Sequence, residues 1–163
     1  MQASVLGRVA ILGFRGEALA SVASGSRLLV SSCAVGSELG YTDAWADDVL
    51  TPIAHPQGTS VEVLDLFYNT PARRRFLRTE RTEFDHINKW IRRLALSRPD
   101  VAFAVSHNGR VVLHLAQATT ADERLQRIAA ICGSAFAEQS VFVEHETDGI
   151  ALSGWIGLPT FNR

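Results

Sequence analysis

Cysteine and long apolar runs are both scarce in this 163-residue sequence. Its two cysteines, Cys33 and Cys132, stand in no Cys-x-x-Cys pair and no Cys/His cluster, which excludes a disulfide framework and a structural zinc site. No apolar run approaches the roughly 18 residues that a membrane helix needs, and residues 1–5 lack the features of a signal peptide. We therefore expect a soluble cytoplasmic protein with reduced, buried thiols and no membrane association.

The chain as a whole also lacks an excess of either charge. It has 16 basic and 17 acidic residues and a net charge of -1. The composition, 47% hydrophobic and 20% charged, is that of a globular protein and excludes a fibre or a wholly disordered chain. A length near 150 residues is usual for one domain, so we expect one domain or parts of two.

The near-neutral total conceals a basic stretch between Pro71 and Pro99. Nine basic residues against three acidic ones give this stretch a charge of +6, and every basic residue of the chain except Lys89 is arginine. Arginine suits fork-like contact with phosphate, so one interpretation is a polyanion site. The other is a solvated helix face whose arginines pair internally with Glu80, Glu83 and Asp85. Charge alone leaves both open.

Apolar periodicity predicts three helices and a larger number of strands. We expect helices at residues 13–24, 79–98 and 121–132, with Thr79 or Thr82 as a cap of the longest. The strands are expected at 27–35, 40–45, 49–53, 59–65, 101–106, 110–115, 141–144 and 150–156, of which 40–45 and 49–53 form the weakest pair. Asn108-Gly109 is the strongest hairpin signal. This order indicates an α+β fold with helices on one face of a sheet, and a polar link near residue 119 predicts a domain boundary there.

One glycine-flanked segment offers candidate chemistry. Gly13 and Gly16 stand at the start of the first predicted helix, where backbone N–H groups could hold a phosphate, although such a pattern is more often a plain turn. It is neither a P-loop nor a dinucleotide-binding motif. The sequence also has no Gly-x-Ser-x-Gly elbow, and its histidines are scattered, so hydrolase and metal chemistry have little support.

Six segments in order resemble motifs of one family. They are LGFRGEALAS (12–21), GTSVEV (58–63), DLFYNTPARRRFL (65–77), TEF (82–84), SHNG (106–109) and ICG (131–133). Together they resemble the MutL family of mismatch-repair proteins from about residue 6 to residue 163. The resemblance implies a partial GHKL-type ATPase sandwich, a mixed sheet with helices on one face, at residues 1–118. The start of a ribosomal S5-like transducer domain would follow at residues 119–163.

The resemblance also implies site residues. The backbone groups of Gly13, Phe14, Arg15, Gly16 and Glu17 would line the triphosphate, and the hydroxyl of Thr59 would reach the adenine side of the pocket. A DNA-facing surface would include Arg73, Arg74, Arg75, Arg78, Arg92 and Arg93. The motifs that carry the family's general-base Glu, its magnesium-binding Asn and its adenine-reading residues have no counterpart in the sequence. We therefore expect an internal fragment that does not hydrolyse ATP alone and leaves Leu19, Val22, Val61 and Val63 partly exposed.

For the complete parent, the resemblance implies an ATP-dependent matchmaker that links mismatch recognition to strand incision. ATP and Mg2+ would be its cofactors. Its partners would be DNA, a MutS-type mismatch recognition protein, and a downstream endonuclease and helicase, and the parent would be a homodimer. The alternative is a nucleotide-independent, basic nucleic-acid-binding α+β module in which residues 13–16 are only a turn.

Overall fold

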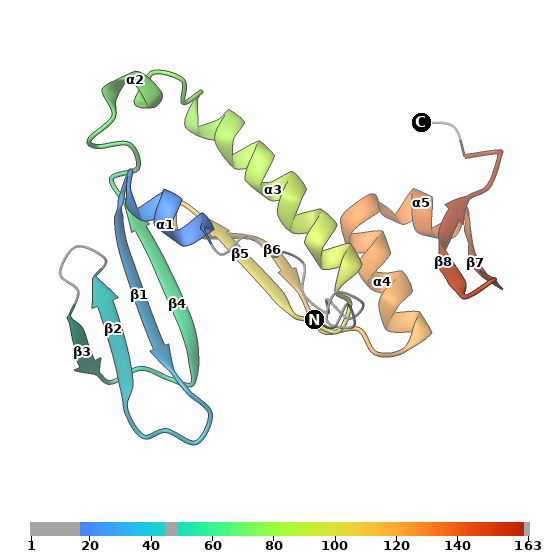
Figure 1. Cartoon of the computed structure of the whole chain (residues 1–163). Coiled ribbons are helices and arrows are strands. Elements are labelled where there is room, and N and C mark those ends of the chain that lie inside the picture. The colour runs from blue at the N-terminus through green and yellow to red at the C-terminus, as the bar shows by residue number, and fades with distance from the viewer. Residues whose placement is uncertain (1–16, 45–48, 162–163) are drawn as a thin grey trace. The chain divides into compact units, whose positions relative to one another are not determined.

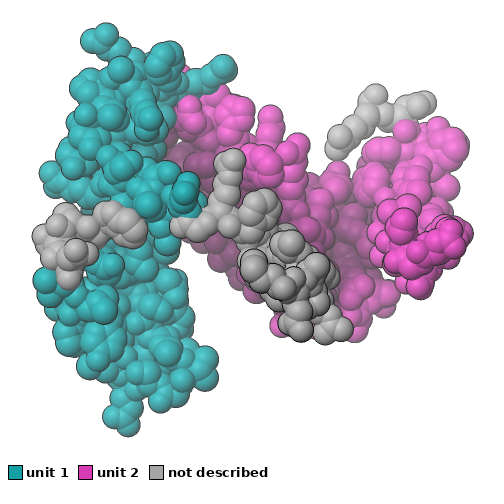
Figure 2. Space-filling view, viewed as in Figure 1, with its two compact units in different colours: residues 1–78 teal, residues 79–163 magenta. Residues whose placement is uncertain are grey.

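The computed structural model describes residues 17–44 and 49–161, which form parts of two compact units (Figures 1 and 2). The first unit comprises residues 1–78 and the second residues 79–163. Residues within each unit lie closer to one another than to the other unit. The predicted domain boundary at residues 118 and 119 falls inside the second unit and stays a prediction.

A four-stranded sheet makes up most of the first unit, with strand order β3-β2-β1-β4 (Figure 1). Its strands are β1 (Arg27–Cys33), β2 (Gly40–Ala44), β3 (Leu50–Ile53) and β4 (Gly58–Leu64), and helix α1 (Ala18–Ala23) precedes them. All four strands confirm the predicted ranges to within two residues over the part of the chain that is described. Every pairing among these four strands is antiparallel. The expected mixed sheet would also include parallel pairs, and none lies among these strands.

One face of this sheet is apolar and largely open to solvent. The register pairs Leu28 with Val63 and Val30 with Val61, so their side chains share a face. Leu28 is buried, but Val61 is 50% and Val63 44% exposed, and Leu19 of α1 is 45% exposed. Together with a half-buried Val22, these values confirm the predicted partial exposure.

A tight loop after β4 is fastened to the turn between α1 and β1. The amide of Phe67 donates to the carbonyl oxygen of Gly25 at 2.5 Å, and the Asn69 side chain donates to that of Ser24 at 2.8 Å. The loop leads into α2 (Pro71–Arg74), a single turn that begins with proline, whose fixed φ suits the first helical position. Periodicity did not predict α2, since one turn is too short to show a stripe.

The second unit contains a long helix, two hairpins and two further helices. They are α3 (Glu80–Ser97), β5 (Phe103–His107), β6 (Arg110–Leu115), α4 (Ala121–Cys132), α5 (Ser134–Glu138), β7 (Ser140–Thr147) and β8 (Ile150–Gly157). The Thr79 hydroxyl caps α3 by accepting a bond from the Thr82 amide, as predicted. Asn108 and Gly109 have φ of 50° and 73°, which confirms the predicted hairpin turn. Helix α5 was not predicted.

A small core lies where α3 meets the β5–β6 hairpin. Ala95, Leu113 and Leu115 are buried, and four half-buried side chains pack on them: Ile91, Phe103, Val105 and Ile131. The buried guanidinium of Arg127 on α4 completes this region by donating to the carbonyl oxygens of Ala95, Arg98, Val101 and Ala116. It thereby ties α4 to the end of α3 and to the segment after β6. No helix among the described residues is long and apolar enough to cross a bilayer.

Candidate functional site

The segment predicted to hold the triphosphate is described only at its end. Gly13, Phe14, Arg15 and Gly16 lie outside the described residues, and Glu17 is the exposed N-cap of α1. Its carbonyl oxygen accepts the first helical bond from the Ser21 amide at 2.9 Å, and its side chain caps nothing. Because the Glu17 carboxylate would repel a phosphate, only its backbone suits the predicted role.

Thr59 lies on the open apolar face of the first unit's sheet. It is the second residue of β4, its side chain is exposed, and its hydroxyl shares a hydrogen bond of 2.9 Å with that of Ser32 on β1. The strand reaches Leu64 beside the start of β1, which directly follows α1. Five residues of extended strand separate Thr59 from that end by roughly 16 Å at about 3.3 Å per residue. The Thr59 hydroxyl is thus a polar group at one end of an apolar face that is long enough for an elongated, partly aromatic ligand.

The described residues supply no magnesium site. No group of three His, Cys, Asp or Glu side chains gathers closely enough in this part of the chain to hold a metal ion. Both cysteines are free thiols; Cys33 is buried, as predicted, and Cys132 is half-buried.

The arginines in and directly after α2, which we call the α2 arginines, are Arg73, Arg74 and Arg75. All three are exposed, and among residues 17–44 and 49–161 no carboxylate lies within ion-pair distance of any of them. Glu80 is instead engaged by the hairpin tip: its Oε1 accepts from Asn108 at 2.6 Å and pairs with His107 Nε2 at 2.9 Å. Within the described residues, the interpretation that this part of the basic stretch neutralises itself is therefore not supported. Arg78 is also exposed.

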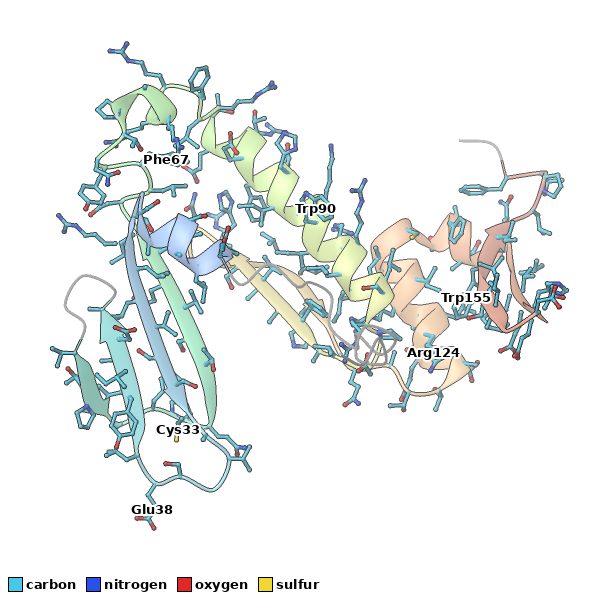
Figure 3. The ribbon with its side chains drawn as sticks, in the orientation of Figure 1. Cys33, Glu38, Phe67, Trp90, Arg124 and Trp155 are labelled. Atoms are coloured by element: carbon cyan, nitrogen blue, oxygen red, sulfur yellow. The ribbon has the colours of Figure 1, made fainter. Side chains whose placement is uncertain are left out.

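The two predicted arginines of α3 differ from each other. Arg93 is exposed, and its guanidinium lies 5.2 Å from the ring centre of Trp90, labelled in Figure 3. Arg92 is half-buried and donates to the Ile131 carbonyl oxygen at 3.1 Å and to Asn88 at 3.3 Å. The apolar stripe of the sequence leaves Arg92 outside the packed face of α3, but this interpretation was wrong, because the long side chain reaches the end of α4. The predicted DNA-facing arginines thus divide between the two units.

A cavity of about 480 Å³ in the second unit contains none of the predicted site residues. Arg124 of α4 and Trp155 of β8, labelled in Figure 3, line it together with Arg127. Arg127 was not predicted to be a packing residue. The available signal was its position: Arg127, Ile128 and Ile131 fall on one side of α4, so the arginine interrupts the apolar stripe.

Comparison with known proteins identifies the family. No family model matches the sequence. The sequence is 53% identical to "DNA mismatch repair protein MutL" of Pseudomonas putida over 156 residues, covering 93% of this chain and 25% of that protein. For MutL of Azotobacter vinelandii the identity is 53% over 162 residues, with 97% and 25% covered. The chain belongs to the MutL family. It spans about a quarter of the length of these MutL relatives.

Solved MutL structures agree with this assignment. The ATPase domain of Aquifex aeolicus MutL complexed with ADP superposes with a TM-score of 0.74 at 28% identity, covering 90% of this chain and 58% of that one. A second structure, the ATPase domain of the mismatch repair endonuclease MutL from the same organism, gives 0.64 at 25%, with 89% and 57% covered. The predicted GHKL ATPase fold is therefore confirmed for this MutL segment.

Proposed function

We propose that this MutL segment forms part of a nucleotide-binding and DNA-contacting region in a mismatch-repair protein that works as an ATP-dependent matchmaker. The observation that carries the proposal is the likeness, over 90% of the chain, to a MutL ATPase domain complexed with ADP. Such a protein couples nucleotide binding to the step between mismatch recognition and strand incision.

The nucleotide would lie along the apolar face of the first unit's sheet. The Thr59 hydroxyl would bond the adenine side, and backbone N–H groups from Gly13 to Glu17 would hold the triphosphate. The exposed hydroxyl on an open apolar face fits an adenine group, since it offers one directed bond beside Val61 and Val63. ATP hydrolysis requires a general base and Mg2+, and the described carboxylates form no cluster that would hold the ion. We therefore expect this chain to contribute to binding and to hydrolyse no ATP alone.

The DNA would contact the basic stretch through its phosphates. The α2 arginines support this role, because their guanidinium groups are exposed and have no carboxylate partner among the residues described. Arg78 and Arg93 are further candidates. Arg92 is the weakest candidate for contact with DNA, because its guanidinium already donates to a backbone carbonyl oxygen. Contacts of this kind position a protein on DNA without reading its sequence.

The remaining expectations concern the complete protein. Its partners would be a MutS-type recognition protein and a downstream endonuclease and helicase. It would be a homodimer and would work in the cytoplasm, where bacterial DNA lies. Only the MutL relationship supports them.

A charge-reversal experiment tests the DNA role. We expect Arg74→Glu with Arg75→Glu to weaken binding to all duplex sequences alike and to flatten the log–log salt dependence by about 0.9 for each phosphate that the variant no longer neutralises. Fluorescence anisotropy over a salt series measures both quantities. Arg110→Glu with Arg124→Glu, which changes the charge equally at exposed positions outside the basic stretch, is the matched control. An unchanged salt slope in the first variant would contradict the DNA role of α2.

A further inference from the structure

Phe76, immediately after the α2 arginines, is exposed to an unusual degree. Its side chain is 84% exposed, although phenylalanine is among the residues most often buried. It follows Arg73, Arg74 and Arg75 directly in the sequence. An aromatic ring and exposed positive charges therefore share one segment.

Local hydrogen bonds hold Phe76 in a defined place. The Arg75 amide donates to the Pro71 carbonyl oxygen at 3.2 Å, and the Phe76 amide donates to that of Arg73 at 3.0 Å, so the helical path continues past the end of α2. Residues three apart on such a path are neighbours, which places the side chains of Arg73 and Phe76 beside each other. The preceding loop is fixed to the rest of the first unit by the bonds of Phe67 and Asn69. The ring is thus presented from an ordered turn.

The neighbouring charges define the kind of ligand that fits. A flat apolar ring beside guanidinium groups matches a ligand that has both a planar face and an anion in each repeating unit, as a nucleotide does. In a duplex, each base is already stacked on both sides and lies inside the helix. In a single strand its face is available. The phosphates are available in both.

We infer that Phe76 is a stacking platform for an unpaired base, and that the α2 arginines hold the phosphates beside it. The inference rests on the proposed DNA role of α2 and refines it: this segment discriminates single-stranded from double-stranded DNA through one aromatic ring. Stacking tolerates any base, so the discrimination is independent of sequence.

The experiment compares two DNA probes with one set of variants of the full chain. The probes are a fluorescently labelled oligothymidine strand and a labelled duplex of the same length, measured by anisotropy at fixed low salt. Phe76→Ala is expected to weaken binding to the single strand by roughly 5-fold to 100-fold, the range for one base–aromatic stack, and to change duplex binding by less than about twofold. Phe76→Trp is expected to restore single-strand binding, because tryptophan also stacks.

Val35 supplies the matched control. It lies in the same unit, between β1 and β2, and is 85% exposed, so Val35→Ala removes an equally exposed apolar side chain away from the arginines. We expect it to change neither affinity. An equal weakening for both probes, or none, on Phe76→Ala would overturn the stacking assignment while leaving the DNA role intact. Failure of the unsubstituted chain to bind either probe would contradict both proposals, and circular dichroism of each variant checks that the fold is retained.

Discussion

At the scale of single residues, Glu80 shows what a sequence can and cannot reveal. The sequence marked Asn108-Gly109 as a turn and Thr79, directly before Glu80, as a helix cap, and both were confirmed. It did not indicate that the two sites meet. In the structure the ring of His107 stacks on Phe84 with centroids 4.0 Å apart, and both His107 and Asn108 bond Glu80. This arrangement depends on tertiary packing between residues more than twenty positions apart, which no local pattern encodes.

The bonds at Glu80 predict a pH-dependent contribution of this residue to stability. The Asn108 amide, and then the His107 ring, hold the pKa of the Glu80 carboxyl below its ordinary 4.5. A lowered pKa in the folded state stabilises the fold above the ordinary value, and the effect is lost as the pH falls through the lower, folded value. We expect Glu80→Gln to reduce the melting temperature at pH 7, and the difference from the unsubstituted chain to vanish in acid.

Thermal unfolding followed by circular dichroism across this pH range measures the effect. Asp85→Asn, on the same helix, is the control, because Asp85 makes no side-chain bond within the described residues. A deficit of Glu80→Gln that is as large in acid as at pH 7 would refute the role of the carboxylate charge.

At the scale of elements, apolar periodicity predicted the strands and the longer helices but not the short ones. Helix α4 begins and ends at the predicted residues because Thr120 and Glu123 form a capping box and Gly133 ends the helix with a φ of 100°. Helices α2 and α5 are too short for a repeating stripe and were missed. The packing of Arg92 and Arg127 was not predicted, because apolar periodicity does not mark charged side chains. Backbone carbonyls at the ends of α3 and α4 accept their bonds instead.

Among the residues that join elements, Arg127 is the one whose replacement we expect to lower the free energy of unfolding most. Arg127→Met keeps much of the side-chain volume but removes the guanidinium donor from four carbonyl oxygens, at a site where Arg127 itself is only 5% exposed. The Arg98 carbonyl oxygen still accepts the Val101 amide, so those of Ala95, Val101 and Ala116 are the ones affected most. Unsatisfied buried groups cost about 1–3 kcal/mol each before relaxation and water entry, so we expect a decrease of about 3 kcal/mol in the free energy of unfolding.

Urea unfolding measures this decrease, and the same helix offers a control. Arg124 is exposed and its side chain makes no hydrogen bond or ion pair within the described residues, so Arg124→Met should change stability by about 0.5 kcal/mol or less. Equal effects of the two substitutions would show that the carbonyl bonds of Arg127 contribute little.

At the scale of the whole molecule, the family was predictable from the order and spacing of its motifs, and the MutL relatives and structures confirm it. The division into two compact units was not predicted at residue 78, since no change in composition accompanies it. The proposed site combines residues that local patterns rank as ordinary. Thr59 is an exposed threonine, and residues 13–16 are a common turn pattern, so only the family relationship gives them roles.

The measurement that tests the central claim most directly is nucleotide binding and hydrolysis by a chimera. In it, the aligned residues of this chain replace their counterparts in Pseudomonas putida MutL, with the unaltered relative as reference. The account predicts magnesium-dependent ATP hydrolysis within about tenfold of the reference and only background from this chain alone. Thr59→Val should weaken nucleotide binding by about 2-fold to 10-fold, the worth of one hydrogen bond, whereas Thr51→Val on β3 should not. A folded chimera that binds no nucleotide, beside an active reference, would contradict the account.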